Sequence, residues 1–233
     1  MSDTVSSEAK VEEVARRMQQ RTDVAASGSA STGDRREIVL VAAATLLNAL
    51  LATALLLFAG ADSDGTELAL RTTARVSFVW FVLTFVASPI HQLWPSSFSD
   101  WLLRRRRAFG IIFGFSMSLH VGFILRLFEL HAPQRPLMVT DADFLIGIPG
   151  LIMVALMTIT SLDAFKQRLG PRRWQLLHSA GSWLVWSIFF LCLVDSVGRK
   201  NTDHPLSAYY AFIIVLLMGL SLRIVAARQR RVV

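Results

Sequence analysis

The chain has 233 residues, 53% of them hydrophobic, and its mean hydropathy of +0.48 excludes an ordinary soluble globular domain. The net charge of +7 does not indicate a nucleic-acid partner, because the basic residues stand in short segments between apolar runs. A single cysteine, Cys192, excludes a disulfide framework within the chain and a cysteine-based metal site.

Residues 1–36 are polar, rich in Ser, Ala and Glu, and lack the apolar core of a signal peptide. They cannot bury enough apolar surface to fold on their own. We therefore predict a disordered cytoplasmic N-terminal tail over 1–36 and a transmembrane domain over 37–233, whose first span acts as the insertion signal.

Six apolar runs follow, each close to the ~20 residues that cross a bilayer as a helix. They cover about 38–60, 73–90, 108–130, 144–162, 174–194 and 206–222. The predicted fold class is all-α, a polytopic membrane bundle of six transmembrane helices. Eighteen of the 24 Lys and Arg residues fall on one side of this arrangement, which places both termini in the cytoplasm.

The second span is expected to end at Pro89, because proline removes a hydrogen bond from the helix. Residues 91–103 mix Trp and Phe with serines and are expected to lie along the membrane surface. Arg104 to Arg107 then precede the third span.

Histidines lie inside two spans, His120 in the third and His178 in the fifth. An imidazole in lipid is costly unless it faces the bundle interior and has a partner. Two of them on separate helices can supply the axial ligands of a haem. The alternative is that each only bonds to a neighbouring helix, as polar residues in membranes often do. His131 and His204 fall in outer loops and are expected to be solvated.

Small residues recur every four positions in the third span and form a ridge that lets a helix or a flat ligand approach closely: Gly110, Gly114, Ser118 and Gly122. Two arginines near the outer ends of spans could meet haem propionates. For Arg75 the alternative is snorkelling to the interface, and for Arg126 it is pairing with Glu129.

Residues in the third and fifth spans carry a resemblance to a known family. They are Arg106-Arg107, Gly110, Leu119-His120, Thr160-Ser161, Leu169-Gly170, Trp174 and Leu177-His178. This pattern resembles the haem-binding membrane subunit of the periplasmic methionine-sulfoxide reductase system, within the ferric-reductase-like transmembrane group. The resemblance covers about residues 73–222.

The resemblance implies a b-type cytochrome of the bacterial inner membrane, an electron-transfer subunit and not a self-contained enzyme. It would pass electrons from a cytoplasmic flavin reductase, through FMN, or from quinone to an acceptor across the membrane, such as a periplasmic redox partner. His120 and His178 are implied as haem ligands. Leu191 stands where the family usually has a further histidine, thirteen residues after His178. At least one haem b is therefore expected, and Leu191 argues against a second haem site.

The depths of the two histidines differ. At ~1.5 Å per residue, His120 lies about 20 Å beyond Arg107, whereas His178 lies about 7 Å beyond Arg173, so untilted helices leave them about 12 Å apart. The third helix could begin below the membrane surface, or the helices could tilt, so that both histidines share one haem. Otherwise His178 pairs with His91 near the inner face while His120 holds a separate site, or the chain has lost haem.

The alternative function is accordingly that of a haem-free membrane scaffold or assembly partner. A transporter is disfavoured, because no pair of broken helices stands in matching halves. No dinucleotide fingerprint is present, so a flavin or nicotinamide module would act in trans. The basic residues on the inner side are Arg104 to Arg107 with Arg168, Arg172 and Arg173. They could dock such a donor, or they could set the membrane topology and bind anionic lipid.

Overall fold

The computed structural model describes residues 35–130, 141–198 and 206–232, and all regular secondary structure in these ranges is helical. The helices are Arg35–Ala59, α2 (Ser63–Leu93), α3 (Ser97–Leu130), α5 (Asp141–Ile159), α6 (Asp163–Leu169), α7 (Pro171–Gly198) and α8 (Leu206–Val232). The chain divides into two compact units, Met1–Ala42 and Ala43–Val233. Most of the predicted N-terminal tail lies outside the described residues, as do His131 and His204.

Five helices in the described ranges are long and apolar enough to cross a membrane: Arg35–Ala59, α2, α3, α7 and the Ser207–Arg230 part of α8. In α5 the described apolar part, Gly147–Ile159, is shorter. Large hydrophobic side chains such as Leu57, Leu176 and Met218 are exposed, as they are on a surface that faces acyl chains. The protein is an all-helical, multi-pass membrane protein.

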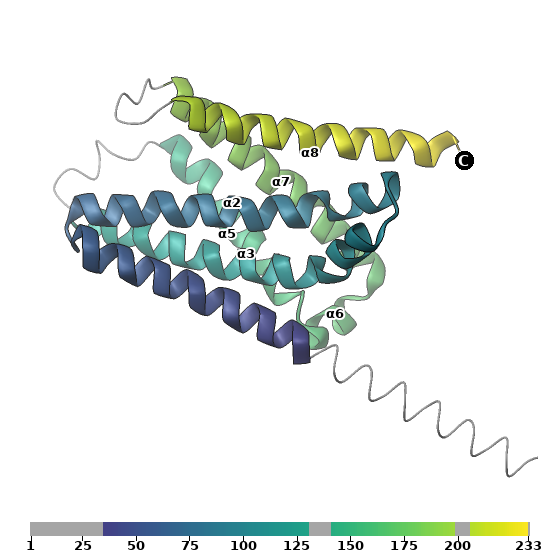
Figure 1. Ribbon diagram of the computed structural model, residues 1–233, viewed down its shortest axis with the longest axis horizontal. Coiled ribbons are helices and arrows are strands. Elements are labelled where there is room, and N and C mark those ends of the chain that lie inside the picture. The colour runs from purple at the N-terminus through teal and green to yellow at the C-terminus, as the bar shows by residue number, and fades with distance from the viewer. Residues whose placement is uncertain (1–34, 131–140, 199–205, 233) are drawn as a thin grey trace, which may run out of the picture. The chain divides into compact units, whose positions relative to one another are not determined.

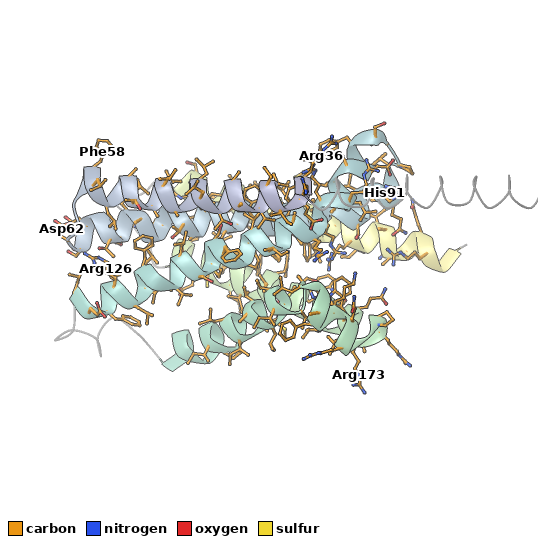
Figure 2. The ribbon with its side chains drawn as sticks, turned by 90° about the horizontal axis from the view of Figure 1, so that it is seen from below. Arg36, Phe58, Asp62, His91, Arg126 and Arg173 are labelled. Carbon is orange, nitrogen blue, oxygen red and sulfur yellow. The ribbon has the colours of Figure 1, made fainter. Side chains whose placement is uncertain are left out.

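Within the unit Ala43–Val233, α2 and α3 form an antiparallel hairpin, with α5, α7 and α8 packed beside it (Figure 1). Phe58, Asp62 and Arg126 lie at one end of this unit, and His91 and Arg173 lie at the other (Figure 2). We refer to these as the Arg126 end and the Arg173 end.

The predicted end of the second span at Pro89 is wrong, because α2 continues through Pro89 to Leu93. Proline has no N–H, so the carbonyl of Phe85, four residues earlier, loses its helical donor. Nε of Arg223, from α8, donates to that carbonyl at 3.3 Å. Nε of Arg106, from α3, donates to the neighbouring carbonyl of Thr84 at 3.1 Å. Two arginines from other helices thus stabilise α2 at its proline.

The segment 91–103 is not a separate element, since it consists of the end of α2, which reaches Leu93, a short turn, and the start of α3 at Ser97; its position at the membrane surface stays a prediction. Ser99 is fully buried and its hydroxyl closes the turn by donating to the carbonyl of Trp94 at 2.9 Å. Arg104 to Arg107 therefore lie within α3 and do not precede it.

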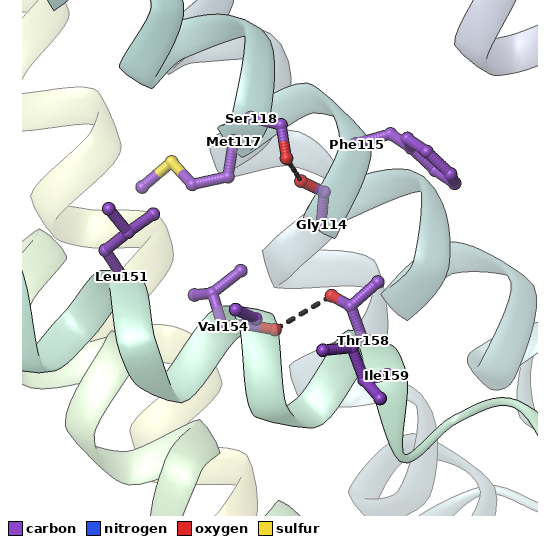
Figure 3. Close-up of a pocket in the computed structure, with 9 residues that line it drawn as sticks. Gly114, Phe115, Met117, Ser118, Leu151, Val154, Thr158 and Ile159 are labelled. Atoms are coloured by element: carbon purple, nitrogen blue, oxygen red, sulfur yellow. Dashed lines mark hydrogen bonds between the residues drawn. The ribbon is translucent and has the colours of Figure 1, made fainter. Parts of the chain in front are cut away.

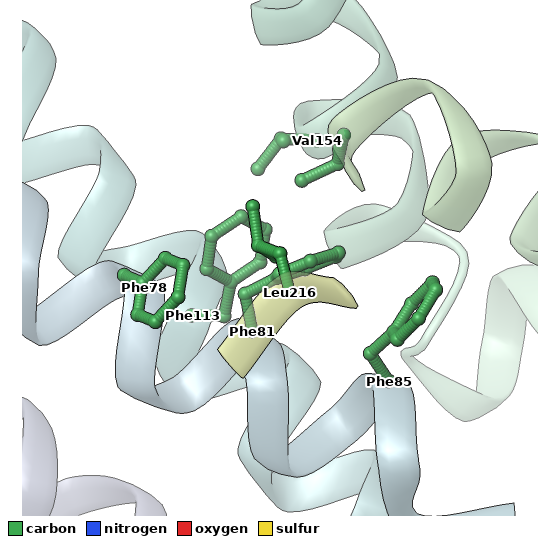
Figure 4. Packing of buried hydrophobic residues seen from close by; sticks show 7 residues of the cluster. Phe78, Phe81, Phe85, Phe113, Val154 and Leu216 are labelled. Atoms are coloured by element: carbon green, nitrogen blue, oxygen red, sulfur yellow. The ribbon is translucent and has the colours of Figure 1, made fainter. Parts of the chain in front are cut away.

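Side chains from five helices meet in one buried hydrophobic cluster (Figure 4), which consists of Phe78, Phe81, Phe85, Phe113, Val154, Val185 and Leu216. Phe189 of α7 packs against it, with its ring centroid 5.5 Å from that of Phe78 and 5.3 Å from that of Phe81. The rings of Phe81 and Phe113 are 5.6 Å apart. We call Phe78, Phe81, Phe113 and Phe189 the aromatic layer.

Candidate functional site

Thr160 joins the end of α5 to the start of α7. Its backbone carbonyl accepts a hydrogen bond from Nε1 of Trp174 at 3.0 Å, and its hydroxyl lies 3.2 Å from Nε2 of His178. The rings of Trp174 and His178 stack with centroids 4.2 Å apart. Gly170 permits the sharp turn before α7 because its φ is +76°. The most specific stretch of the sequence thus forms a compact joint between two helices.

The hydrogen bonds of this joint assign the tautomer of His178. The hydroxyl of Thr160 donates its proton to the carbonyl of Leu156 at 2.6 Å. It therefore accepts from His178, whose Nε2 must carry the proton. The lone pair of this imidazole is consequently on Nδ1.

His120 has the opposite arrangement. Its Nδ1 lies 3.1 Å from the backbone carbonyl of Leu70, and 3.4 Å from the hydroxyl of Thr73, both in α2. A carbonyl only accepts, so Nδ1 carries the proton and the lone pair is on Nε2. A metal-bound histidine typically donates its other ring N–H in this way, which fixes the orientation of the ring. His120 is therefore arranged as a metal ligand would be.

The structure does not bring His120 and His178 together. Arg107 donates to the backbone carbonyl of Ser161 at 2.9 Å, so the Thr160 joint lies beside Arg107 of α3. Thr158, two residues before Thr160, contacts Gly114 of α3, so the joint lies about 12 Å from His120 along the bundle. The aromatic layer lies between the two levels. Imidazole nitrogens bind metals at about 2 Å, so this pair does not fit as the two axial ligands of one iron.

The glycines of α3 do not face one ligand. A Cβ on Gly114 would lie 2.1 Å from Oγ1 of Thr158 in α5, whereas a Cβ on Gly110 would meet only Thr84 of α2, at 3.8 Å. A Cβ on Gly122 would have no neighbour within 4 Å. The ridge therefore serves close packing against two different helices, most tightly at Gly114.

A pocket of about 200 Å³ lies between α3 and α5 beside Gly114 (Figure 3). The hydroxyls at its wall bond to their own helices, Ser118 to the carbonyl of Gly114 and Thr158 to that of Val154. The remaining side chains that line the pocket, such as Met117 and Leu151, are apolar. The pocket therefore offers mainly apolar contact.

The other candidates lie near opposite ends of the bundle. Arg126 donates to the hydroxyl of Thr66 at 3.3 Å and to the carbonyl of Ala61 at 2.7 Å, which ties α3 to the start of α2. Arg75 is exposed on α2. His91 bonds through Nδ1 to the carboxylate of Asp100 at 3.1 Å.

Sequence reasoning missed the roles of Arg106 and Arg223. Arg223 also donates to the hydroxyl of Ser182 at 3.2 Å and lies 3.8 Å from the ring centroid of Phe85. Pro89 was the available signal, because a proline inside an apolar span leaves a carbonyl that needs another donor.

Comparisons with known proteins agree with these features. A family described as ferric reductase like transmembrane component matches residues 73–190, just over half of the chain. These residues include His120, the Thr160 joint and the aromatic layer.

Relatives include protein-methionine-sulfoxide reductase heme-binding subunits MsrQ from three bacteria. The Ralstonia nicotianae protein is 28% identical over 66% of this chain and 70% of its own length. The Herminiimonas arsenicoxydans protein is 26% identical over 71% of this chain and 73% of its own length. The Deinococcus radiodurans protein is 28% identical over 80% of this chain and 91% of its own length. No solved structure matches the chain. The chain belongs to the ferric-reductase-like transmembrane family, and its resemblance to the haem-binding subunits within that family is confirmed.

Proposed function

We propose that this protein is a membrane electron-transfer subunit that binds haem b and passes electrons across the bacterial inner membrane. The observation that carries this proposal is the imidazole of His120, fixed through Nδ1 by the carbonyl of Leu70, so that Nε2 keeps its lone pair. Family membership supports it, because the relatives are named as heme-binding subunits.

A bound haem would supply one-electron chemistry. The chain would hold the iron at Nε2 of His120, and the aromatic layer would keep water from crossing the bundle below it. Ligand roles for His178 and His91 and propionate roles for Arg75 and Arg126 stay predictions. Of the two glycines predicted to make space for the macrocycle, Gly114 is filled by Thr158, and only Gly110 keeps that prediction.

Six spans with both termini in the cytoplasm are part of the proposal. The sixth span would be α5, and the Arg173 end would be the cytoplasmic one, as the distribution of basic residues favours. A flavin reductase with FMN, or quinone, would donate electrons from that side. The acceptor would be the catalytic subunit of a methionine-sulfoxide reductase at the Arg126 end, since the relatives are named as subunits of such an enzyme.

A reduced-minus-oxidised optical spectrum of membranes that contain the protein tests the haem. We expect a b-type signal that disappears in His120→Ala and persists in Ser221→Ala. Ser221 is a suitable control because its hydroxyl is exposed and, among the described residues, bonds to the carbonyl of Leu217 in its own helix. Equal absence of the signal from all three proteins would favour the rival function, a haem-free scaffold that keeps the helical frame.

A further inference from the structure

The described histidines are His91, His120 and His178, and they lie at two levels of the bundle. We infer that this chain ligates its haem iron through one imidazole, that of His120, and that His178 holds the joint between α5 and α7. This inference rests on the proposed function and concerns only how the haem is held.

The two rings differ in which nitrogen is available. In His120 the proton is on Nδ1, bound to the carbonyl of Leu70, and in the described residues Nε2 makes no hydrogen bond. In His178 the proton is on Nε2, bound to Thr160, and one ring face is covered by Trp174. His120 keeps its lone pair on Nε2, the ring nitrogen farther from its own backbone, whereas His178 keeps its lone pair on Nδ1, the nearer one, and its Nε2 is held by Thr160.

The environment of His120 also fits a bound group. Ser77 follows Thr73 by one turn of α2, so the two lie on the same face. Its hydroxyl is fully buried and has no hydrogen-bond partner in the described part of the chain. A buried hydroxyl without a partner is costly, so a group bound beside Thr73 would gain a donor there.

No second described imidazole reaches this level. Thr160, which binds His178, lies about 12 Å from His120 along the bundle, because Thr158 contacts Gly114 six residues before His120. His91 is eighteen residues beyond Thr73 on α2, which is about 27 Å, and its Nδ1 is held by Asp100. Among the described imidazoles only that of His120 would then hold the iron, which predicts a high-spin state.

Purified protein with bound haem tests this inference by optical and EPR spectroscopy. We expect a high-spin ferric signal that shifts to low-spin when free imidazole is added. His120→Gly should weaken haem binding at least tenfold, a loss typical of weakened metal ligation, and free imidazole should restore it. His178→Gln should leave haem content and spin state unchanged, because glutamine can still donate to Thr160.

Rescue of His120→Gly by imidazole also separates ligand loss from misfolding, because a misfolded variant is not rescued. A low-spin signal before imidazole is added, lost in His178→Gln, His131→Ala or His204→Ala, would overturn the inference and leave the proposed function standing. Protein that binds no haem would overturn both.

Discussion

The hydroxyl of Thr160 contributes to stability because it accepts the N–H of His178 in a partly buried position. Thr160→Val removes the hydroxyl with little change of shape and leaves that N–H without an acceptor. We expect a loss of about 1–3 kcal/mol, seen as a lower midpoint of thermal unfolding in detergent. Thr53→Val is the control, since Thr53 is exposed and, in the described part of the chain, its hydroxyl bonds to the carbonyl of Ala49 in its own helix. An equal loss in both variants would contradict the role of the joint.

Gly114 and Gly122 lie eight residues apart on α3, and we expect their substitution by alanine to change the stability in opposite directions. In Gly114→Ala the new methyl group would collide with Thr158, so we expect a loss of about 1–3 kcal/mol from overpacking. Gly122→Ala meets open space and should stabilise α3 by up to about 1 kcal/mol through helix propensity.

Thermal unfolding of both alanine variants, and of Gly114→Ala combined with Thr158→Ala, measures this contact. The combined variant should recover most of the stability, because it removes the side chain that the methyl group meets. If Thr158→Ala does not rescue Gly114→Ala, the contact between α3 and α5 is not the cause of the lost stability.

At the scale of the helix, Pro89 and Arg223 should be coupled. Arg223→Ala removes the donor to the carbonyl of Phe85, and we expect a loss of about 1.5–3 kcal/mol. In a Pro89→Ala background the restored N–H can bond to the same carbonyl. The effect of Arg223→Ala should then be smaller by at least about 0.5 kcal/mol. A double-mutant cycle of unfolding free energies checks this, and strict additivity would show that the two residues act independently.

At the scale of the whole molecule, the proposed topology predicts which end faces the cytoplasm. Cys192 is the only cysteine, so a Cys192→Ala background accepts single cysteines at chosen sites. In intact cells we expect a membrane-impermeant maleimide to label Ala61→Cys, next to Asp62 at the Arg126 end, and not Arg173→Cys. Labelling of Arg173→Cys in intact cells would show that the orientation in the membrane is the reverse of the proposed one.

Much of this architecture follows from the sequence. Long apolar runs predict helices because a backbone in lipid must satisfy its hydrogen bonds internally. The regular rise of a helix also predicts that His120 and His178 lie at different depths. The tilted or displaced helix that would let them share one iron is not what the structure shows, since the Arg107 contact holds His178 far from His120.

The continuation of α2 through Pro89 and the two tautomers could not be predicted. Each depends on a partner far away in the sequence: Arg223 for the carbonyl of Phe85, and Leu70 for Nδ1 of His120. A single sequence shows that such a group needs a hydrogen-bond partner, but it does not show which distant helix provides the partner. At Pro89, for example, the sequence shows only that a carbonyl loses its local donor.

The aromatic layer also has a consequence for protons. Protons move along chains of closely spaced polar groups, and phenylalanine rings provide no donor or acceptor for such a chain. Among the side chains that the structure describes, the layer separates the polar groups around Arg106 from those around His120. If His120 holds a haem as proposed, the layer would act as an insulating septum, and a proton taken up to balance an electron there would come from the water at the Arg126 end.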